Sequence, residues 1–157
     1  MALDLPARDV CFAVFSQRRD ARIDVAEWGR HAERFLATRV GLTEDKRYEA
    51  DAPLHDVARV VLVPAGETGQ ACTRTCWGRP RTEDDLRAAE SAPDAGAGLA
   101  DLARRCPQIW LVEVTREDDL LSLRLAAILA GVLLGPILTP HGRALFGPKT
   151  ARQRLAL

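Results

Sequence analysis

Two cysteines, Cys72 and Cys76, form the closest thiol pair in the 157-residue chain. Neighbouring thiols are the minimum that a redox site or half of a zinc site requires. If segment 70–77 is a β-strand, however, its two thiols lie about 13 Å apart, which is too far for a disulfide and awkward for one metal ion. Because Cys11 and Cys106 are isolated in the sequence, we expect buried, unreactive thiols and no bound metal.

The three histidines, His31, His55 and His141, have no nucleophile or base at a spacing that is diagnostic of a catalytic site. The glycine-containing stretch 66–71 follows a predicted strand but lacks the lysine of a phosphate-binding loop. The sequence therefore predicts no catalytic residue and no cofactor.

Three arginines, Arg74, Arg79 and Arg81, flank Trp77. Guanidinium groups bind carboxylates and phosphates, and tryptophan and arginine are the residues most enriched at protein–protein hot spots. The patch lacks the several aromatic residues that base stacking needs, and the chain as a whole carries 22 basic and 22 acidic residues. We therefore predict that Arg74, Trp77, Arg79 and Arg81 bind a protein partner, and nucleic acid is the less favoured ligand.

The length suits one domain with its own core, and 47% hydrophobic with 28% charged residues is the composition of a globular protein. No acidic residue follows Asp119. We therefore expect a single domain over 1–157 in which 139–157 is a basic C-terminal tail.

The first ten residues lack the basic start and apolar centre of a secretory signal. Four cysteines in a chain of this length are typical of reduced thiols, so we expect a cytoplasmic protein with no membrane contact. Only Lys46 and Lys149 among the 22 basic residues are lysine, a bias that the codons of a GC-rich bacterial genome produce.

Apolar runs separated by turn signals predict the secondary structure. Asp24 with Glu27 predicts a helix start, and Gly41 predicts its end. Polar segment 42–56 predicts an exposed connection. The predicted strands are 10–16, 57–64, 70–77 and 108–114, the second and third forming a hairpin. The predicted helices are 25–40, 82–105 with a break at Pro93, and a long one from a Thr115–Asp118 capping box to about 134.

This order of elements is typical of the ferredoxin-like split βαβ fold with an added C-terminal helix. If 70–77 is a loop, the alternative is a small doubly wound α/β sheet. Segment 120–138 is nearly all apolar and close to the length of about 20 residues that a membrane span needs, but Arg124 and Gly135 argue against a span. We expect a buried helix that covers the open face of the sheet, within the chain or across a homodimer.

The leading functional hypothesis is a non-catalytic protein-interaction module, such as an adaptor, an inhibitor or immunity protein, or an assembly subunit that also self-associates. The alternative is a small thiol-dependent enzyme or a metal or redox protein that uses Cys72 and Cys76. A third hypothesis, nucleic-acid binding through the arginines and the basic tail, predicts a steep loss of affinity with salt.

Overall fold

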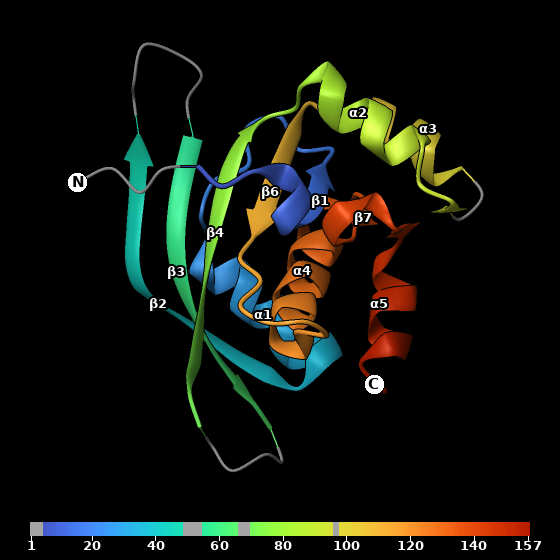
Figure 1. The fold of residues 1–157 in the computed structure, drawn as a ribbon. Helices are drawn as coiled ribbons and strands as arrows, with labels where there is room; N and C mark the ends of the chain where they lie inside the picture. The colour runs from blue at the N-terminus through green and yellow to red at the C-terminus, as the bar shows by residue number, and fades with distance from the viewer. Residues whose placement is uncertain (1–4, 49–54, 66–69, 96–97) are drawn as a thin grey trace.

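The computed structural model describes residues 5–48, 55–65, 70–95 and 98–157 (Figure 1). Within these ranges eight strands form one sheet in the order β2-β3-β4-β6-β1-β7-β8-β5. Neighbouring strands run antiparallel, except for the parallel pair β5 and β8. The strands are β1 (Phe12–Ser16), β2 (Thr38–Tyr48), β3 (His55–Pro64), β4 (Cys72–Pro80), β5 (Asp94–Ala95), β6 (Gln108–Val112), β7 (Ile137–Leu138) and β8 (Ala144–Phe146).

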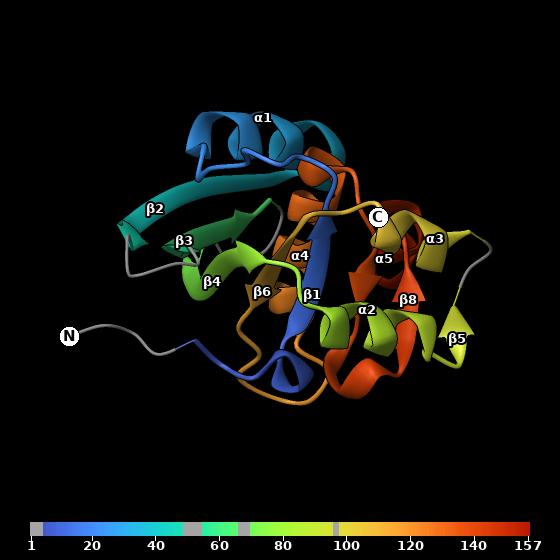
Figure 2. The same ribbon diagram turned by 90° about the horizontal axis from the view of Figure 1, so that it is seen from above.

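Helices cover both faces of this sheet, which confirms the predicted α+β class. Figure 2 shows α1 and α2 on opposite sides of the strands. The α-helices in the described ranges are α1 (Val25–Leu36), α2 (Glu83–Glu90), α3 (Leu99–Arg104), α4 (Leu120–Leu133) and α5 (Pro148–Arg154). Two short 3-10 helices, η1 (Arg8–Val10) and η2 (Pro140–Gly142), precede β1 and β8.

The sheet separates two apolar clusters, and the central strand β1 contributes to both. Phe12 and Val14 face the cluster that α1, α4 and α5 cover, while Ala13 and Phe15 face the cluster that α2 and α3 cover. All five residues of β1 are buried. The prediction that 10–16 holds a strand buried on both faces is therefore confirmed.

Helix α1 starts where the sequence predicts and ends earlier. The Asp24 side chain accepts a hydrogen bond from the Glu27 amide. The helix stops at Leu36 because Ala37 adopts a left-handed conformation with φ 46°. Arg124 of α4 donates to the Leu36 carbonyl at 2.7 Å, which satisfies an end group that a helix leaves unpaired. The predicted helix end at Gly41 is wrong.

Strand β2, with 11 residues, is the longest element that the sequence prediction missed. Val40 and Leu42 pack against the core, while Arg39 and Thr43 are exposed, which is the two-residue alternation of a half-buried strand. Val40 lies opposite Leu62 of β3. The segment predicted as an exposed connection is therefore partly strand, and its residues 49–54 lie outside the described part of the chain.

The strand order does not confirm a ferredoxin-like fold. That fold would place β4 beside β1, whereas here β6 lies between them, with Val112 opposite both Cys76 and Phe12. The physical reason is that β6 is apolar on both faces, so it belongs in the interior of the sheet. The sheet also has more strands than that fold. The doubly wound alternative is wrong because β3 and β4 form the predicted antiparallel hairpin.

Helix α4 is buried as predicted, but it packs beside α1 and not on the opposite face, which α2 and α3 cover. Gly131 permits this close approach, since a Cβ there would overlap the imidazole of His31 in α1. The helix is capped by Asp119 and not by the predicted Thr115–Asp118 box. Among the described residues, no helix is long and apolar enough to cross a membrane.

The predicted basic tail forms η2, β8 and α5. Ala151 of α5 is fully buried, and β8 joins the sheet between β7 and β5. The tail therefore contributes to the fold.

Gly135, just after α4, lies against β1, so a Cβ there would overlap the carbonyl oxygen of Phe15. Because backbone atoms cannot move aside cheaply, we expect Gly135→Ala to lower the free energy of unfolding by about 3 kcal/mol. The control is Gly29→Ala in α1, where the described structure leaves open space for a methyl group and the helix gains about 0.5–1 kcal/mol. Urea unfolding measures the free energy of unfolding of both variants. Equal changes in the two variants would contradict the close contact at Gly135.

Candidate functional site

The four residues of the predicted partner-binding patch do not form one surface. Arg74 lies on the sheet face that α4 covers, and its guanidinium holds the Asp119 carboxylate in two hydrogen bonds, at 3.0 Å and 2.9 Å. It also donates to the Ser122 hydroxyl at 2.9 Å. Arg74 therefore ties β4 to the start of α4.

Asp119 is buried, and its side chain is shared between this ion pair and the helix cap. It accepts hydrogen bonds from the backbone amides of Ser122 and Thr115. Burial by itself raises the pKa of Asp119, but the hydrogen bonds from Arg74, Thr115 and Ser122 outweigh it and hold the pKa below its ordinary value. The carboxylate therefore stays ionised.

The other three patch residues lie on the opposite side of the sheet or just beyond the end of β4. Trp77 is only 7% exposed and packs in the cluster under α2 and α3. Arg79 pairs with Asp85 at 2.6 Å and 2.9 Å. Arg81 donates to the Cys106 carbonyl at 2.8 Å. Of the predicted patch, only Arg79 lines one of the two openings described below.

The cysteines are spread over the fold. Cys72 is exposed and Cys76 is buried, four positions along β4, and Cys11 and Cys106 are also buried. Burial raises the pKa of Cys76 to about 12 and the pKa values of Cys11 and Cys106 to about 11. A catalytic thiolate has a lowered pKa and is partly exposed, whereas these three thiols are buried and have raised pKa values.

The histidines do not gather at one site. His31 packs on Phe35 with ring centroids 4.7 Å apart, and burial, with a smaller effect of Arg152, lowers its pKa. His141 is exposed in η2, and the side chain of His55 lies outside the described part. Across the described ranges, no cluster of histidine, cysteine and acidic residues could hold a metal ion.

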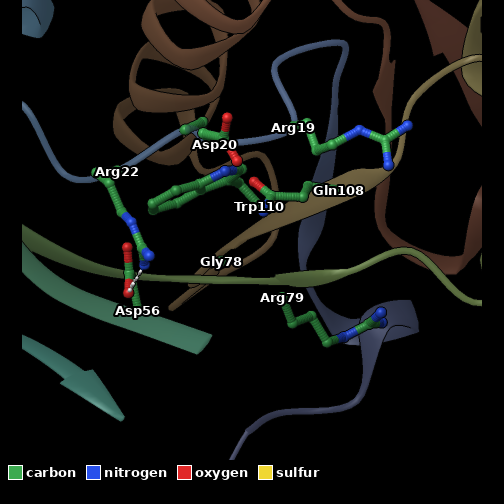
Figure 3. Close-up of a pocket in the computed structure, with 9 residues that line it drawn as sticks. Arg19, Asp20, Arg22, Asp56, Gly78, Arg79, Gln108 and Trp110 are labelled. Atoms are coloured by element: carbon green, nitrogen blue, oxygen red, sulfur yellow. Dashed lines mark hydrogen bonds and ion pairs between the residues drawn. The ribbon is translucent and has the colours of Figure 1, made fainter. Parts of the chain in front are cut away.

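A pocket of about 130 Å³ opens at the end of the sheet where β1 leads into α1 (Figure 3). Its walls come from the β1–α1 connection, the start of β3, the end of β4 and the start of β6. The lining residues are Arg19, Asp20, Ala21, Arg22, Asp56, Gly78, Arg79, Gln108 and Trp110. We call this the arginine–tryptophan pocket.

Trp110 is the buried wall of this pocket. Its indole lies against Gly78, where a Cβ would be 2.7 Å from the ring, and it meets Trp28 edge-on at 5.7 Å. The ring is 1% exposed, and its Nε1 has no hydrogen-bond acceptor among the residues that the structure describes. A buried donor without an acceptor is costly, so the indole N–H is suited to a ligand that brings one.

Charged side chains surround this indole. Arg22 contacts Asp56 at 3.3 Å, on one side of the ring in Figure 3, and Gln108 lies on the other side. Arg79 points away from the indole toward its partner Asp85. Arg19 is exposed and makes no ion pair with a described residue, and in Figure 3 its guanidinium points away from the indole, whereas Asp20 lies next to the ring. The pocket can therefore offer Arg22 and the indole N–H to an anionic oxygen, with Arg19 farther along its lining.

The sequence analysis missed this pocket. The run 17–22, rich in arginine and directly after a buried strand, was a signal that was visible in the sequence. Asp56, Gly78 and Gln108 join the pocket only through the strand order, which the sequence did not reveal.

A larger groove of about 930 Å³ lies at the opposite end of the β1–β6 pair. Its walls come from η1, the β6–α4 connection, η2 and α5, and its lining combines apolar side chains, among them Phe12 and Phe146, with charged ones. Two non-glycine residues in its walls, Asp118 and His141, have left-handed backbone conformations, with φ 53° and 62°. We call it the η1–η2 groove.

Because Arg74 and Asp119 form a buried pair, we expect Arg74→Gln to lower the free energy of unfolding by about 3 kcal/mol at neutral pH. The folded-state pKa of Asp119 lies below its unfolded value, so this stabilisation is present above about pH 4 and is lost as the pH falls through the folded pKa. The exposed Arg104→Gln should cost about 0.5 kcal/mol or less. Urea unfolding at neutral pH and well below about pH 4 tests this expectation. A small effect of Arg74→Gln on the free energy of unfolding at neutral pH would contradict it.

The cysteine environments predict one reactive thiol in the native chain. We expect a disulfide-exchange reagent to modify Cys72 rapidly and Cys11, Cys76 and Cys106 only after unfolding, because a thiolate is the reacting form. Mass spectrometry counts the labels. Fast native modification of Cys76 would contradict its burial and revive the thiol-enzyme hypothesis.

At each of the two openings a ligand could meet several polar groups. In comparisons with protein-family models, curated proteins and solved structures, none matched this chain. The function therefore has to be inferred from the geometry of the openings.

Proposed function

We propose that this chain is a non-catalytic binding module that holds an acidic side chain of a partner protein in the arginine–tryptophan pocket. The observation that carries the proposal is the indole N–H of Trp110, which is buried without an acceptor in the described structure and belongs to a pocket that Arg19 and Arg22 also line. A carboxylate supplies the missing acceptor and a charge that guanidinium groups bind.

The size and charge of the pocket favour a single carboxylate. A volume of about 130 Å³ holds a few heavy atoms, such as the end of an aspartate or glutamate side chain. The lining carries three arginines and two aspartates, but Arg79 already pairs with Asp85, so two arginines and two aspartates remain in balance. A lining without excess charge suits one carboxylate better than a doubly charged phosphate or a polyanionic nucleic acid.

Pre-organisation supports binding at this position. Gly78 and Trp28 fix the Trp110 ring, and Asp56 holds the Arg22 side chain near it. Groups that are already held lose little conformational entropy when a ligand binds. Tryptophan and arginine are also enriched among the few residues that supply most of the binding energy at protein interfaces.

The thiol-dependent alternative receives no comparable support, because Cys76 is buried with a raised pKa and Cys72 stands apart from it on β4. A cytoplasmic location, a bacterial source and self-association stay predictions from the sequence.

The test follows the indole N–H signals of the three tryptophans by ¹H–¹⁵N NMR. Titration with a hexaglutamate peptide should shift the Trp110 signal, since its N–H gains an acceptor. The Trp77 signal should stay fixed, because Trp77 lies on the other face. A hexalysine peptide should leave both signals unchanged.

Variants locate the binding. Arg19→Gln should weaken hexaglutamate binding about tenfold, the loss of one charge-assisted hydrogen bond. Arg104→Gln, an exposed arginine on α3, should leave the affinity unchanged. An immobile Trp110 signal, an equal response to hexalysine, or tighter binding of inorganic phosphate than of the peptide would overturn the proposal.

A further inference from the structure

Asp20 is an exposed acidic residue in the lining of the arginine–tryptophan pocket. Its side chain makes no ion pair and no hydrogen bond with a residue of the described ranges. Figure 3 shows Asp20 next to the Trp110 indole, whereas the guanidinium of Arg19 points away from the ring. A negative charge therefore lies beside the N–H group that, in the proposed function, meets the partner's carboxylate.

The other charges of the lining are paired, with one exception. Arg22 contacts Asp56 at 3.3 Å, and Arg79 is held by an aspartate of α2 at 2.6 Å. Arg19 and Asp20 remain without an ion pair to a described residue, one charge of each sign. A ligand that matches this lining therefore brings one charge of each sign as well.

A carboxylate that accepts from the indole N–H comes close to Asp20. Like charges in one small site repel each other, most strongly where water is partly excluded. A cation next to the ligand's carboxylate removes this repulsion, because it can pair with Asp20. The carboxylate can still bind Arg22, which uses Nη1 for Asp56 and, like every guanidinium, has five N–H donors in all.

The cation has to come from outside the pocket. A volume of about 130 Å³ holds the carboxylate end of one side chain. Asp20 is exposed, so a group that remains in solvent at the mouth of the pocket can reach it. A basic side chain on a neighbouring residue of the partner meets this condition.

We propose that the partner carries a lysine or arginine next to the acidic residue that enters the pocket, and that Asp20 selects for it. This inference rests on the proposed function and specifies the chemistry of the partner segment. Arg22 and the Trp110 indole N–H hold the carboxylate, and Asp20 holds the cation at the mouth of the pocket. A segment with two neighbouring carboxylates is the less favoured ligand.

Three capped tetrapeptides test the proposal: Gly-Glu-Lys-Gly, Gly-Glu-Gln-Gly and Gly-Glu-Glu-Gly. They differ only in the residue after the glutamate, which is a cation, a neutral amide or a second carboxylate. Titration followed at the Trp110 indole signal by ¹H–¹⁵N NMR gives the three affinities. We expect the lysine peptide to bind about threefold more tightly than the glutamine peptide, and the glutamate peptide about threefold more weakly, which is the effect of one exposed charge pair.

Asp20→Asn tests whether Asp20 causes this preference. The variant should weaken binding of the lysine peptide and strengthen binding of the glutamate peptide, so that the three affinities agree within about twofold. Asp9→Asn is the matched control. Asp9 is exposed in η1, has no ion pair with a described residue and does not line the pocket, so this variant should keep the preference.

The outcomes separate this inference from the proposed function. Equal affinities of the three peptides for the unchanged protein, or an unchanged preference in Asp20→Asn, would overturn the selection by Asp20. The shift of the Trp110 signal would then still support the proposed function. A Trp110 signal that neither the tetrapeptides nor hexaglutamate moves would overturn the proposed function, and this inference with it.

Discussion

The burial of two central strands on both faces is the constraint from which the rest of the structure follows. The side chains of β1 and β6 point alternately into two apolar clusters, and almost none of them reaches water. A sheet centre of this kind is stable only if helices cover both of its faces. The layer of α1, α4 and α5 and the layer of α2 and α3 meet that requirement.

Two arginines fix the position of the apolar helix α4 relative to strand β4 and helix α1. Nonpolar packing alone specifies position weakly, because apolar contacts have no preferred direction. Arg74 binds the cap residue Asp119 at the start of α4, and Arg124 binds the end of α1. Leaving either charge buried without its partner would be costly, so these contacts select one register between the helices and the sheet.

The sequence predicted the elements whose signals are local. The cap at Asp24, the apolar run 10–16 and the hairpin of β3 and β4 were all recognisable. Strand β2 was missed because charged residues interrupt its alternation of apolar and polar side chains. Gly41 also matches the signal of a helix C-terminus, although it lies within the strand. The arginine patch failed for a reason already present in the strand prediction: residues 74 and 77 differ by an odd number, so they point to opposite faces.

The same constraint explains where binding sites can occur. With both faces of β1 and β6 covered, their aromatic side chains cannot serve as an open platform for stacked bases, as they can in sheets that bind RNA. Ligands are left with the ends of these strands, where loops from distant parts of the chain converge. The arginine–tryptophan pocket contains Gln108 at the start of β6, and the η1–η2 groove contains Val114 just after its end. The packed strands between them separate a polar pocket from a groove of mixed apolar and charged lining, so residues at either opening can change without disturbing the core.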